Sequence, residues 1–139
     1  ISFGRNAPTP NTFQPFQKLR VEFLNAGQAG KFVDLLAVPA GKRAVIETVT
    51  VNNQLPHGQK PQITIITTAG GTSVNHWLTL TPQVPDPSSS DDWFSATLST
   101  RLYADPATSI QFFLGRVAAG YTGDDGATVT ISGYYVDVP

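Results

Sequence analysis

The side chains that could support catalysis are few and lie far apart in the sequence. The chain has two histidines, His57 in a loop rich in Pro and Gly and His76 in a β-type segment, and it has no cysteine. No serine lies in a G-x-S-x-G pattern, so nothing in the sequence places a nucleophile beside a base. Two separate histidines do not make a zinc site by themselves. We therefore predict that the protein is not an enzyme and assign it no cofactor.

Carboxylates gather in two loop segments, at Asp86, Asp91 and Asp92 and again at Asp124 and Asp125. Carboxylate oxygens on loops are ligands that Ca²⁺ prefers, but the spacing matches no calcium-loop motif. Aspartate is also common in turns, because its side chain bonds to nearby backbone groups. We expect the turn role and assign no metal site, and the sequence leaves calcium binding open.

Three aromatic residues next to polar groups suggest a second kind of chemistry. Trp77, Trp93 and Tyr121 could stack on a sugar, with Asp91 or Asp124 as hydrogen-bonding partners. Tryptophan is equally able to anchor the core of a β-sandwich. A glycan contact at these three aromatics is therefore one hypothesis, and a core role is the other.

Composition excludes some partners. Charged residues make up 14% of the chain, the net charge is −1, and no basic cluster is present, whereas nucleic-acid binding depends on Lys and Arg gathered on one side. No apolar run approaches the ~20 residues of a membrane-spanning helix. The chain begins at Ile1 and is rich in Thr, Ser and Asn, so we expect a processed, secreted protein with no nucleic-acid partner and no membrane span.

The elements that would position these residues are β-strands. The segment 31–53 contains two β-type runs around the turn Pro39–Lys42, where Pro and Gly suit a chain reversal. We expect these runs to pair as a hairpin. In the second run, alternation places Val45, Glu47, Val49 and Val51 on one face and Ala44, Ile46, Thr48 and Thr50 on the other.

Six further segments have strand character. In 17–24, alternation predicts that Leu19, Val21 and Phe23 face the core. The segment 62–68 is so rich in β-branched residues that we expect a central strand covered on both faces. The remaining strands are expected at 73–81, 93–103, 109–117 and 127–138. About eight short strands with Gly/Pro turns and no helical period predict an all-β fold, a two-sheet antiparallel β-sandwich of jelly-roll-like type.

The first sixteen residues contain three prolines and no sustained period, which excludes a helix or an interior strand. We expect an ordered N-terminal arm over residues 1–16 and a single β-sandwich domain over residues 17–139. The arm either packs on its own domain through Phe3, Phe13 and Phe16 or docks on a neighbouring copy. In the second case the subunit-interface residues are Phe3, Phe13, Phe16, Leu19 and Val21.

The segments VPAGKRAVIETVTV (residues 38–51) and TVTISGYYVDVP (residues 128–139) resemble small uncharacterised secreted bacterial proteins in which a V-P-A-G-K-R turn opens a strand. The resemblance covers about a quarter of the chain, implies an exported β-sandwich, and transfers no functional residue. The expected architecture is also similar to jelly-roll domains and to extracellular filament subunits that exchange N-terminal strands, as an analogy of fold only.

Two functions follow as hypotheses. The first is a secreted structural or adhesive protein that self-assembles into a homo-oligomer or filament, with the N-terminal arm added as a strand to a neighbouring subunit. The second is a carbohydrate-binding module that uses exposed aromatic residues. The first is favoured because the sequence supplies an arm but no catalytic group.

Overall fold

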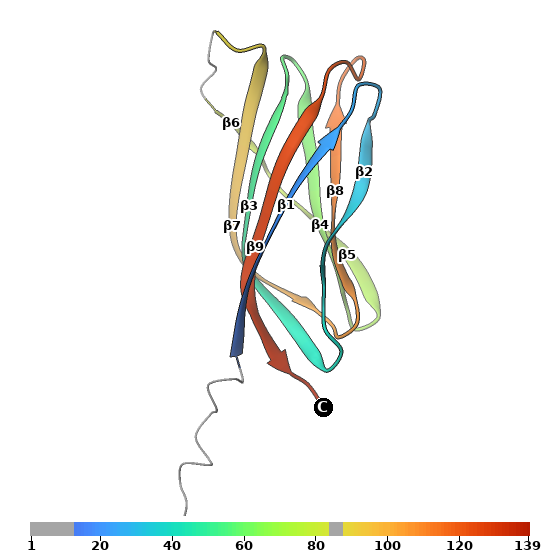
Figure 1. The fold of residues 1–139 in the computed structure, drawn as a ribbon, viewed down its shortest axis with the longest axis vertical. Coiled ribbons are helices and arrows are strands. Elements are labelled where there is room, and N and C mark those ends of the chain that lie inside the picture. The colour runs from blue at the N-terminus through green and yellow to red at the C-terminus, as the bar shows by residue number, and fades with distance from the viewer. Residues whose placement is uncertain (1–12, 84–87) are drawn as a thin grey trace, which may run out of the picture.

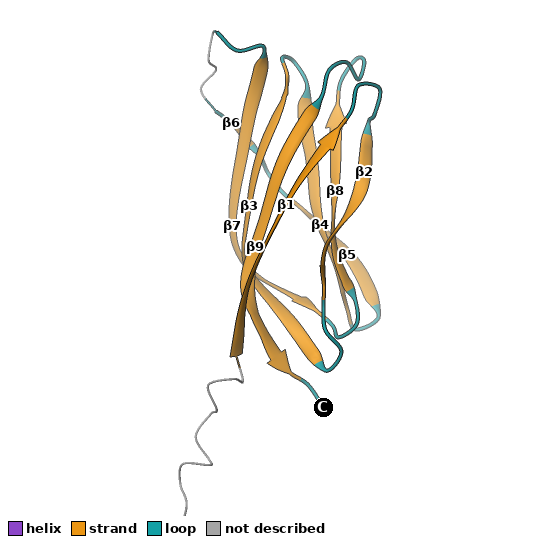
Figure 2. Cartoon of the chain, in the orientation of Figure 1, coloured by secondary structure: helices purple, strands orange, loops and turns teal. Residues whose placement is uncertain are grey.

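The computed structural model of the chain describes residues 13–83 and 88–139, and these residues form two antiparallel sheets without a helix (Figures 1 and 2). Across this described part no helix is long and apolar enough to cross a membrane. The strands are β1 (Phe13–Leu24), β2 (Gly30–Ala37), β3 (Lys42–Pro56), β4 (Lys60–Ala69), β5 (Thr72–Trp77), β6 (Thr81–Pro82), β7 (Asp91–Ala104), β8 (Ser109–Val117) and β9 (Asp125–Asp137).

The strand order is that of a jelly roll. One sheet has five strands in the order β1-β9-β3-β7-β6, and the other has four in the order β2-β8-β4-β5. Apart from the two-residue β6, the first half of the chain pairs in reverse order with the second half, β1 with β9, β2 with β8, β3 with β7 and β4 with β5. This pattern of two packed antiparallel sheets confirms the predicted fold class.

The core lies between the inner faces of the two sheets, as expected for a sandwich. Its fully buried side chains are mostly β-branched or leucine, with Phe112 the largest. The strand β4 was correctly predicted as central, because it lies between β8 and β5 and its residues Ile63 to Thr67 are all buried.

The expected hairpin between the two runs of segment 31–53 is wrong. The turn itself is present, since Lys42 N donates to Pro39 O at 3.2 Å and Gly41 has a φ of 78°. However, β2 pairs with β8 in one sheet, and β3 pairs with β7 and β9 in the other. The turn therefore carries the chain from one sheet to the other, and the two strands contribute buried side chains to the core from opposite sheets.

A β-bulge at Glu47 also changes the predicted faces of β3. Ile46 and Thr48 pair with the adjacent β9 residues Gly133 and Ser132, so Glu47 is the extra residue. Before the bulge Ile46 is buried, and after it Val49 is buried, while Glu47 is exposed. The predicted set that joined Glu47 to Val49 was wrong because one inserted residue reverses the alternation.

The prediction of which face of β1 lies in the core was also wrong. Leu19, Val21 and Phe23 do alternate with polar residues, but they are 57%, 49% and 55% exposed. Among the described residues β1 is an edge strand whose single partner is β9. Its inner face instead carries Leu24, which is fully buried, and Glu22, which accepts a hydrogen bond from Lys31 Nζ of β2 at 2.7 Å. The apolar stripe of β1 therefore faces outward.

β1 begins at Phe13, so the last four residues of the expected arm lie in the sheet and pair with β9 of the same chain. The ring of Phe13 lies 5.2 Å from that of Tyr134, and Phe16 packs 4.7 Å from Tyr135 beside the core. These two phenylalanines thus have partners within their own chain. Phe3 and the rest of residues 1–12 lie outside the described residues.

Gly133 provides a test of the register at the bulge. A Cβ atom at this position would overlap the carbonyl oxygen of Val45 on β3, and backbone cannot move aside as a flexible side chain can. We expect Gly133→Ala to lower the free energy of unfolding by about 3 kcal/mol, measured by urea denaturation. Gly120→Ala is the matched control, since nothing lies within 4 Å of a Cβ there; equal stability of the two variants would contradict this register.

Candidate functional site

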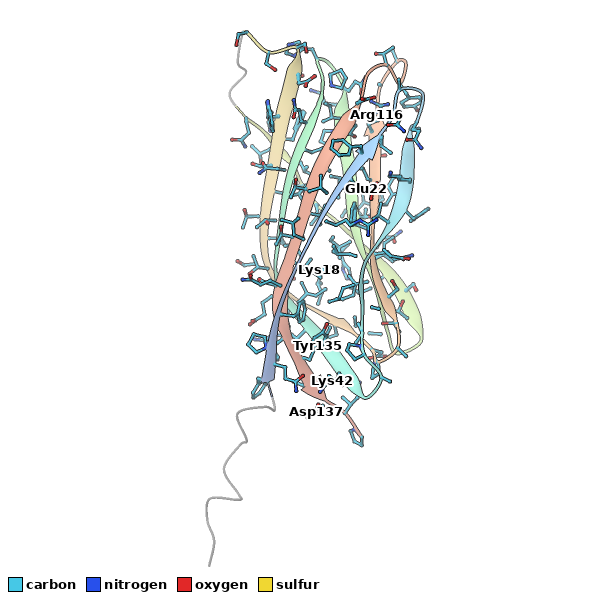
Figure 3. All side chains as sticks on the ribbon, viewed as in Figure 1. Lys18, Glu22, Lys42, Arg116, Tyr135 and Asp137 are labelled. Atoms are coloured by element: carbon cyan, nitrogen blue, oxygen red, sulfur yellow. The ribbon has the colours of Figure 1, made fainter. Side chains whose placement is uncertain are left out.

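A buried polar cluster closes the end of the sandwich where three loops meet. Among the described residues it consists of Asn53, Gln59, Arg116 and Asp125, each no more than 4% exposed. Figure 3 shows Arg116 at this end, opposite to Lys42 and Asp137, which form an ion pair of 2.6 Å at the other end. We call these four residues the loop-end cluster.

Arg116 holds the loops together through its guanidinium. Its Nε donates to Gln28 O at 2.9 Å, its Nη1 to Gly123 O at 3.0 Å, and its Nη2 to Asn25 O at 3.1 Å. Nη1 also donates to Oε1 of Gln59 at 3.1 Å. A planar group with five donors suits this task, because it satisfies several loop carbonyls that are shielded from water.

Asp125 is the perturbed carboxyl of the cluster. Burial raises its pKa to about 6, against the opposing effects of a hydrogen bond from Asn53 Nδ2 and of the Arg116 charge. Asn53 Nδ2 also donates to Gly126 O at 2.8 Å, and neither Asn53 Oδ1 nor Asp125 Oδ2 has a hydrogen-bond partner. The cluster supports the loops from inside the protein, because its four side chains are buried.

The other described aspartates of the two acidic loops bond to groups that are distant in the sequence, so these contacts do not show the expected turn role; Asp86 lies outside the described residues. Asp91 Oδ2 accepts from Gln54 Nε2 at 2.5 Å, and Asp124 Oδ1 accepts from the Ala26 amide at 3.2 Å. Asp92 accepts from the Gly58 amide at 3.1 Å and lies 2.6 Å from Nδ1 of His57. Nowhere in residues 13–83 and 88–139 do three His, Cys, Asp or Glu side chains gather around a space for a metal ion.

The two histidines have separate structural contacts. Asp92, together with the Ser89 carbonyl at 2.8 Å from Nε2, raises the pKa of His57, which is exposed. Burial lowers the pKa of His76, whose Nε2 lies 2.9 Å from Thr67 Oγ1. His57 thus contacts a carboxylate and a carbonyl, whereas His76 contacts the hydroxyl of Thr67 on the neighbouring strand β4.

The outer face of the five-stranded sheet carries the most distinctive surface. Its middle is made of short neutral polar side chains, which the register places in neighbouring rows: Thr48, Thr50, Asn52, Ser95, Thr97, Ser99, Thr128, Thr130 and Ser132. Next to this area on β1 is the apolar stripe of Phe13, Leu19, Val21 and Phe23, which we call the β1 outer face.

A groove crosses this surface near the loop end. Phe23 of β1, Gly126 of β9, Gln54 of β3 and Trp93 of β7 pair across the sheet in one row. Two adjoining hollows of about 210 and 190 Å³ share Phe23, Gln54 and Gly126 in their walls. One extends toward Trp93 and the other toward Asp91 and Asp124. We call this feature, which lies across four strands, the outer groove.

The three predicted glycan contacts do not meet in one site. Trp93 lines the outer groove, whereas Trp77 is 67% exposed on β5 of the other sheet. The ring of Tyr121 lies 5.9 Å from the guanidinium of Arg116 in the loop-end region. Trp93 lines one hollow of the outer groove, and Asp91 and Asp124, the carboxylates predicted to assist it, line the adjoining one.

Sequence reasoning missed three parts of this surface. The role of Gly126 could not be predicted, because it depends on the close approach of the Phe23 ring from the neighbouring strand. Phe23 was expected to face the core. The expected strand segment ended at residue 53, whereas β3 continues through Gln54. The missed signal was the run of Thr, Ser and Asn at alternate positions of three strands, which is typical of a solvent-facing sheet surface.

Comparison with known proteins gives a fold but no family. The sequence matches no protein-family model and no curated protein. The structure is similar to a chain of the capsid asymmetric unit of cyanophage Pam1, with a TM-score of 0.53, 14% identity, and coverage of 94% of this chain and 90% of that chain. It is also similar to a chain in the acid-stable capsid of Helicobacter pylori bacteriophage KHP30, with a TM-score of 0.50, 11% identity, and coverage of 91% and 94%.

A chain of the Bacillus endospore appendages, described as pili, aligns over 96% of this chain and 97% of its own length with 11% identity and a TM-score of 0.32. That score is too low to carry an argument about filaments. The two phage chains confirm the jelly-roll architecture, whereas the expected kinship with secreted bacterial β-sandwich proteins gains no family match.

Asp125 makes folding stability depend on pH in a defined direction. Its native pKa of about 6 exceeds that of the unfolded chain, so the native state holds the proton more tightly. Its contribution is fully present below about pH 4 and is lost as the pH rises through about 6, a change of about 3 kcal/mol.

We expect the difference in unfolding free energy between the wild type and Asp125→Asn to fall by this amount from about pH 4 to 7, measured by urea denaturation at each pH. Taking this difference cancels the contributions that Glu22, Asp92 and Asp105 make to stability in both proteins. Their lowered pKa values change stability with pH in the opposite direction. A difference that stays constant with pH would show that Asp125 is ionised in the native state throughout this range.

Proposed function

We propose that this chain is a self-assembling structural subunit of a capsid-like shell, with the β1 outer face as its principal contact. The observation that carries the proposal is the apolar stripe of Phe13, Leu19, Val21 and Phe23, whose exposed fractions lie between 49% and 57%. A strand whose alternate residues are apolar is suited to bury the face that carries them, yet in the single chain this face is exposed to solvent. Large exposed apolar patches usually mark protein interfaces.

The structural comparisons support the shell rather than another assembly. The alignments with this chain include 90% and 94% of the residues of the two phage capsid chains. Each is therefore one jelly roll of about this size within a capsid. In a shell, every subunit contacts several neighbours, so a domain of this fold needs exposed contact surfaces on more than one side.

The strength of the contact can be bounded. Fully burying one large apolar side chain contributes about 2 kcal/mol, so four half-exposed side chains contribute about 4 kcal/mol together. Micromolar affinity requires about 8 kcal/mol, and association also costs entropy. The β1 outer face alone therefore gives a weak pair, and stable assembly requires several such contacts made at once.

The N-terminal segment is the second contact that we propose. The outer edge of β1 has no neighbouring strand among the described residues, and an exposed edge accepts an added strand through main-chain hydrogen bonds. Residues 1–12 would supply that contact by docking on a neighbouring copy. Secretion, adhesion and a filament rather than a closed shell remain predictions.

A matched pair of double variants tests the β1 outer face. We expect Phe13→Ser with Leu19→Thr to weaken assembly at least about tenfold, because two half-exposed apolar anchors are lost. The readout is sedimentation velocity over a concentration series.

The control is Phe32→Ser with Val117→Thr on the other sheet, with similarly exposed residues and a similar ring contact between Phe32 and Phe113 at 5.0 Å. The control should assemble as the wild type does. A wild type that stays monomeric at millimolar concentration, or two double variants that assemble alike, would refute the proposal.

Deletion of residues 1–12 tests the second contact. The deletion leaves every described strand intact, since β1 is described from Phe13 onward. We expect unchanged far-UV circular dichroism with weaker assembly. If the shortened chain assembles with wild-type affinity, the N-terminal segment makes no contact between copies.

A further inference from the structure

We propose that the outer groove binds a neutral carbohydrate. The sites of stacking are Phe23 and Trp93, which are 55% and 41% exposed at the two ends of the row across β1, β9, β3 and β7. Three strand spacings separate their backbones by roughly 14 Å. That span accommodates a short oligosaccharide, and the C–H faces of sugar rings pack well on aromatic side chains.

Gly126 creates the depth of the groove. A Cβ atom there would lie 3.0 Å from Cε1 and 3.2 Å from Cδ1 of Phe23. Any side chain at this position would fill the floor and push the phenyl ring away. Because this residue has no side chain, the Phe23 ring can lie directly against it, and Gly126 lines both hollows.

The polar lining offers the hydrogen bonds that sugar hydroxyls need. Asn52, Gln54 and Thr128 present neutral donors and acceptors along the floor. The bond from Gln54 Nε2 to Asp91 Oδ2, at 2.5 Å, fixes the plane of the Gln54 amide, so a ligand meets an oriented group. Asp91 and Asp124 add acceptors at the loop end.

The charges in the groove select the ligand class. Neither hollow is lined by Lys or Arg, while two carboxylates stand at one end. Phosphorylated ligands, nucleic acids and sialylated or uronic sugars would meet repulsion without compensation. Neutral hexoses and N-acetylhexosamines fit a lining of amides, hydroxyls and aromatic faces.

This inference does not depend on self-assembly. The substitutions that test the β1 outer face, at Phe13 and Leu19, do not line either hollow. Failure of assembly and failure of sugar binding are therefore separate results, obtained with different variants.

The experiment begins with an array of neutral, N-acetylated and sialylated oligosaccharides. Neutral hits are then titrated by tryptophan fluorescence in a Trp77→Phe background, where Trp93 is the single tryptophan. We expect binding only to neutral glycans and a spectral shift from Trp93. Absence of any neutral hit at millimolar concentration, or preference for sialylated glycans, would overturn the inference.

Three variants, measured by calorimetric titration, locate the site. Trp93→Ala should weaken binding about tenfold or more through loss of one stacking face. Gly126→Ala should weaken it by filling the floor, and because its backbone does not have a positive φ the fold should persist. Trp77→Ala, a more exposed tryptophan on the other sheet, is the control and should bind as the wild type does.

Thermal melts of the same variants establish that they are folded. If folded Trp93→Ala and Gly126→Ala both keep wild-type affinity, or if Trp77→Ala alone loses binding, the outer groove is not the carbohydrate site.

Discussion

The pairing of β9 with both β1 and β3 is the interaction on which the rest of the structure depends. It joins the last strand to the first and places β9 inside the five-stranded sheet. The bulge at Glu47 and the close approach of Gly133 to Val45 fix the register of β9 on β3. The register of β1 on β9 then fixes which face of β1 looks outward. Both the apolar stripe and the row that forms the outer groove follow from these two registers.

The loop-end cluster provides hydrogen bonds to main-chain carbonyls at the end of the sandwich, as strand pairing does within the sheets. Loops that close a sandwich bring main-chain carbonyls out of contact with water, and each needs a donor. Arg116 supplies donors to several of these carbonyls. Asp125 lies close enough for the Arg116 charge to lower its pKa, but burial outweighs this effect. The cluster holds the loops that carry Asp124 and frame one end of the groove.

The two proposed surfaces share a sheet and differ in chemistry. The β1 outer face offers apolar side chains along an edge strand, which suits repeated weak contacts between copies. The outer groove combines aromatic walls with amides and hydroxyls, which suits a hydrated ligand. A shell subunit whose sheet edge contacts neighbours would keep the opposite end of that groove, at Trp93, toward solvent. Val21 and Phe23 belong to both surfaces, so a subunit contact over the whole β1 outer face would cover one stacking site of the groove, and the two uses compete at Phe23.

The sequence alone determined the class of the fold and most of its strands. Alternation and β-branched composition predicted the strands that became β4 and β8, and Pro39–Lys42 was correctly read as a turn. Local pattern also separated the apolar from the polar face of β1. It could not say which face meets the core, since that depends on the strands β1 pairs with. Tertiary structure alone decided the partner of β2 and the bulge at Glu47. It also decided that Trp93 and Phe23 lie in one row across four strands. Alternation depends only on residues that are adjacent in the sequence. Pairing and register depend on how all the strands together bury the inner faces of both sheets.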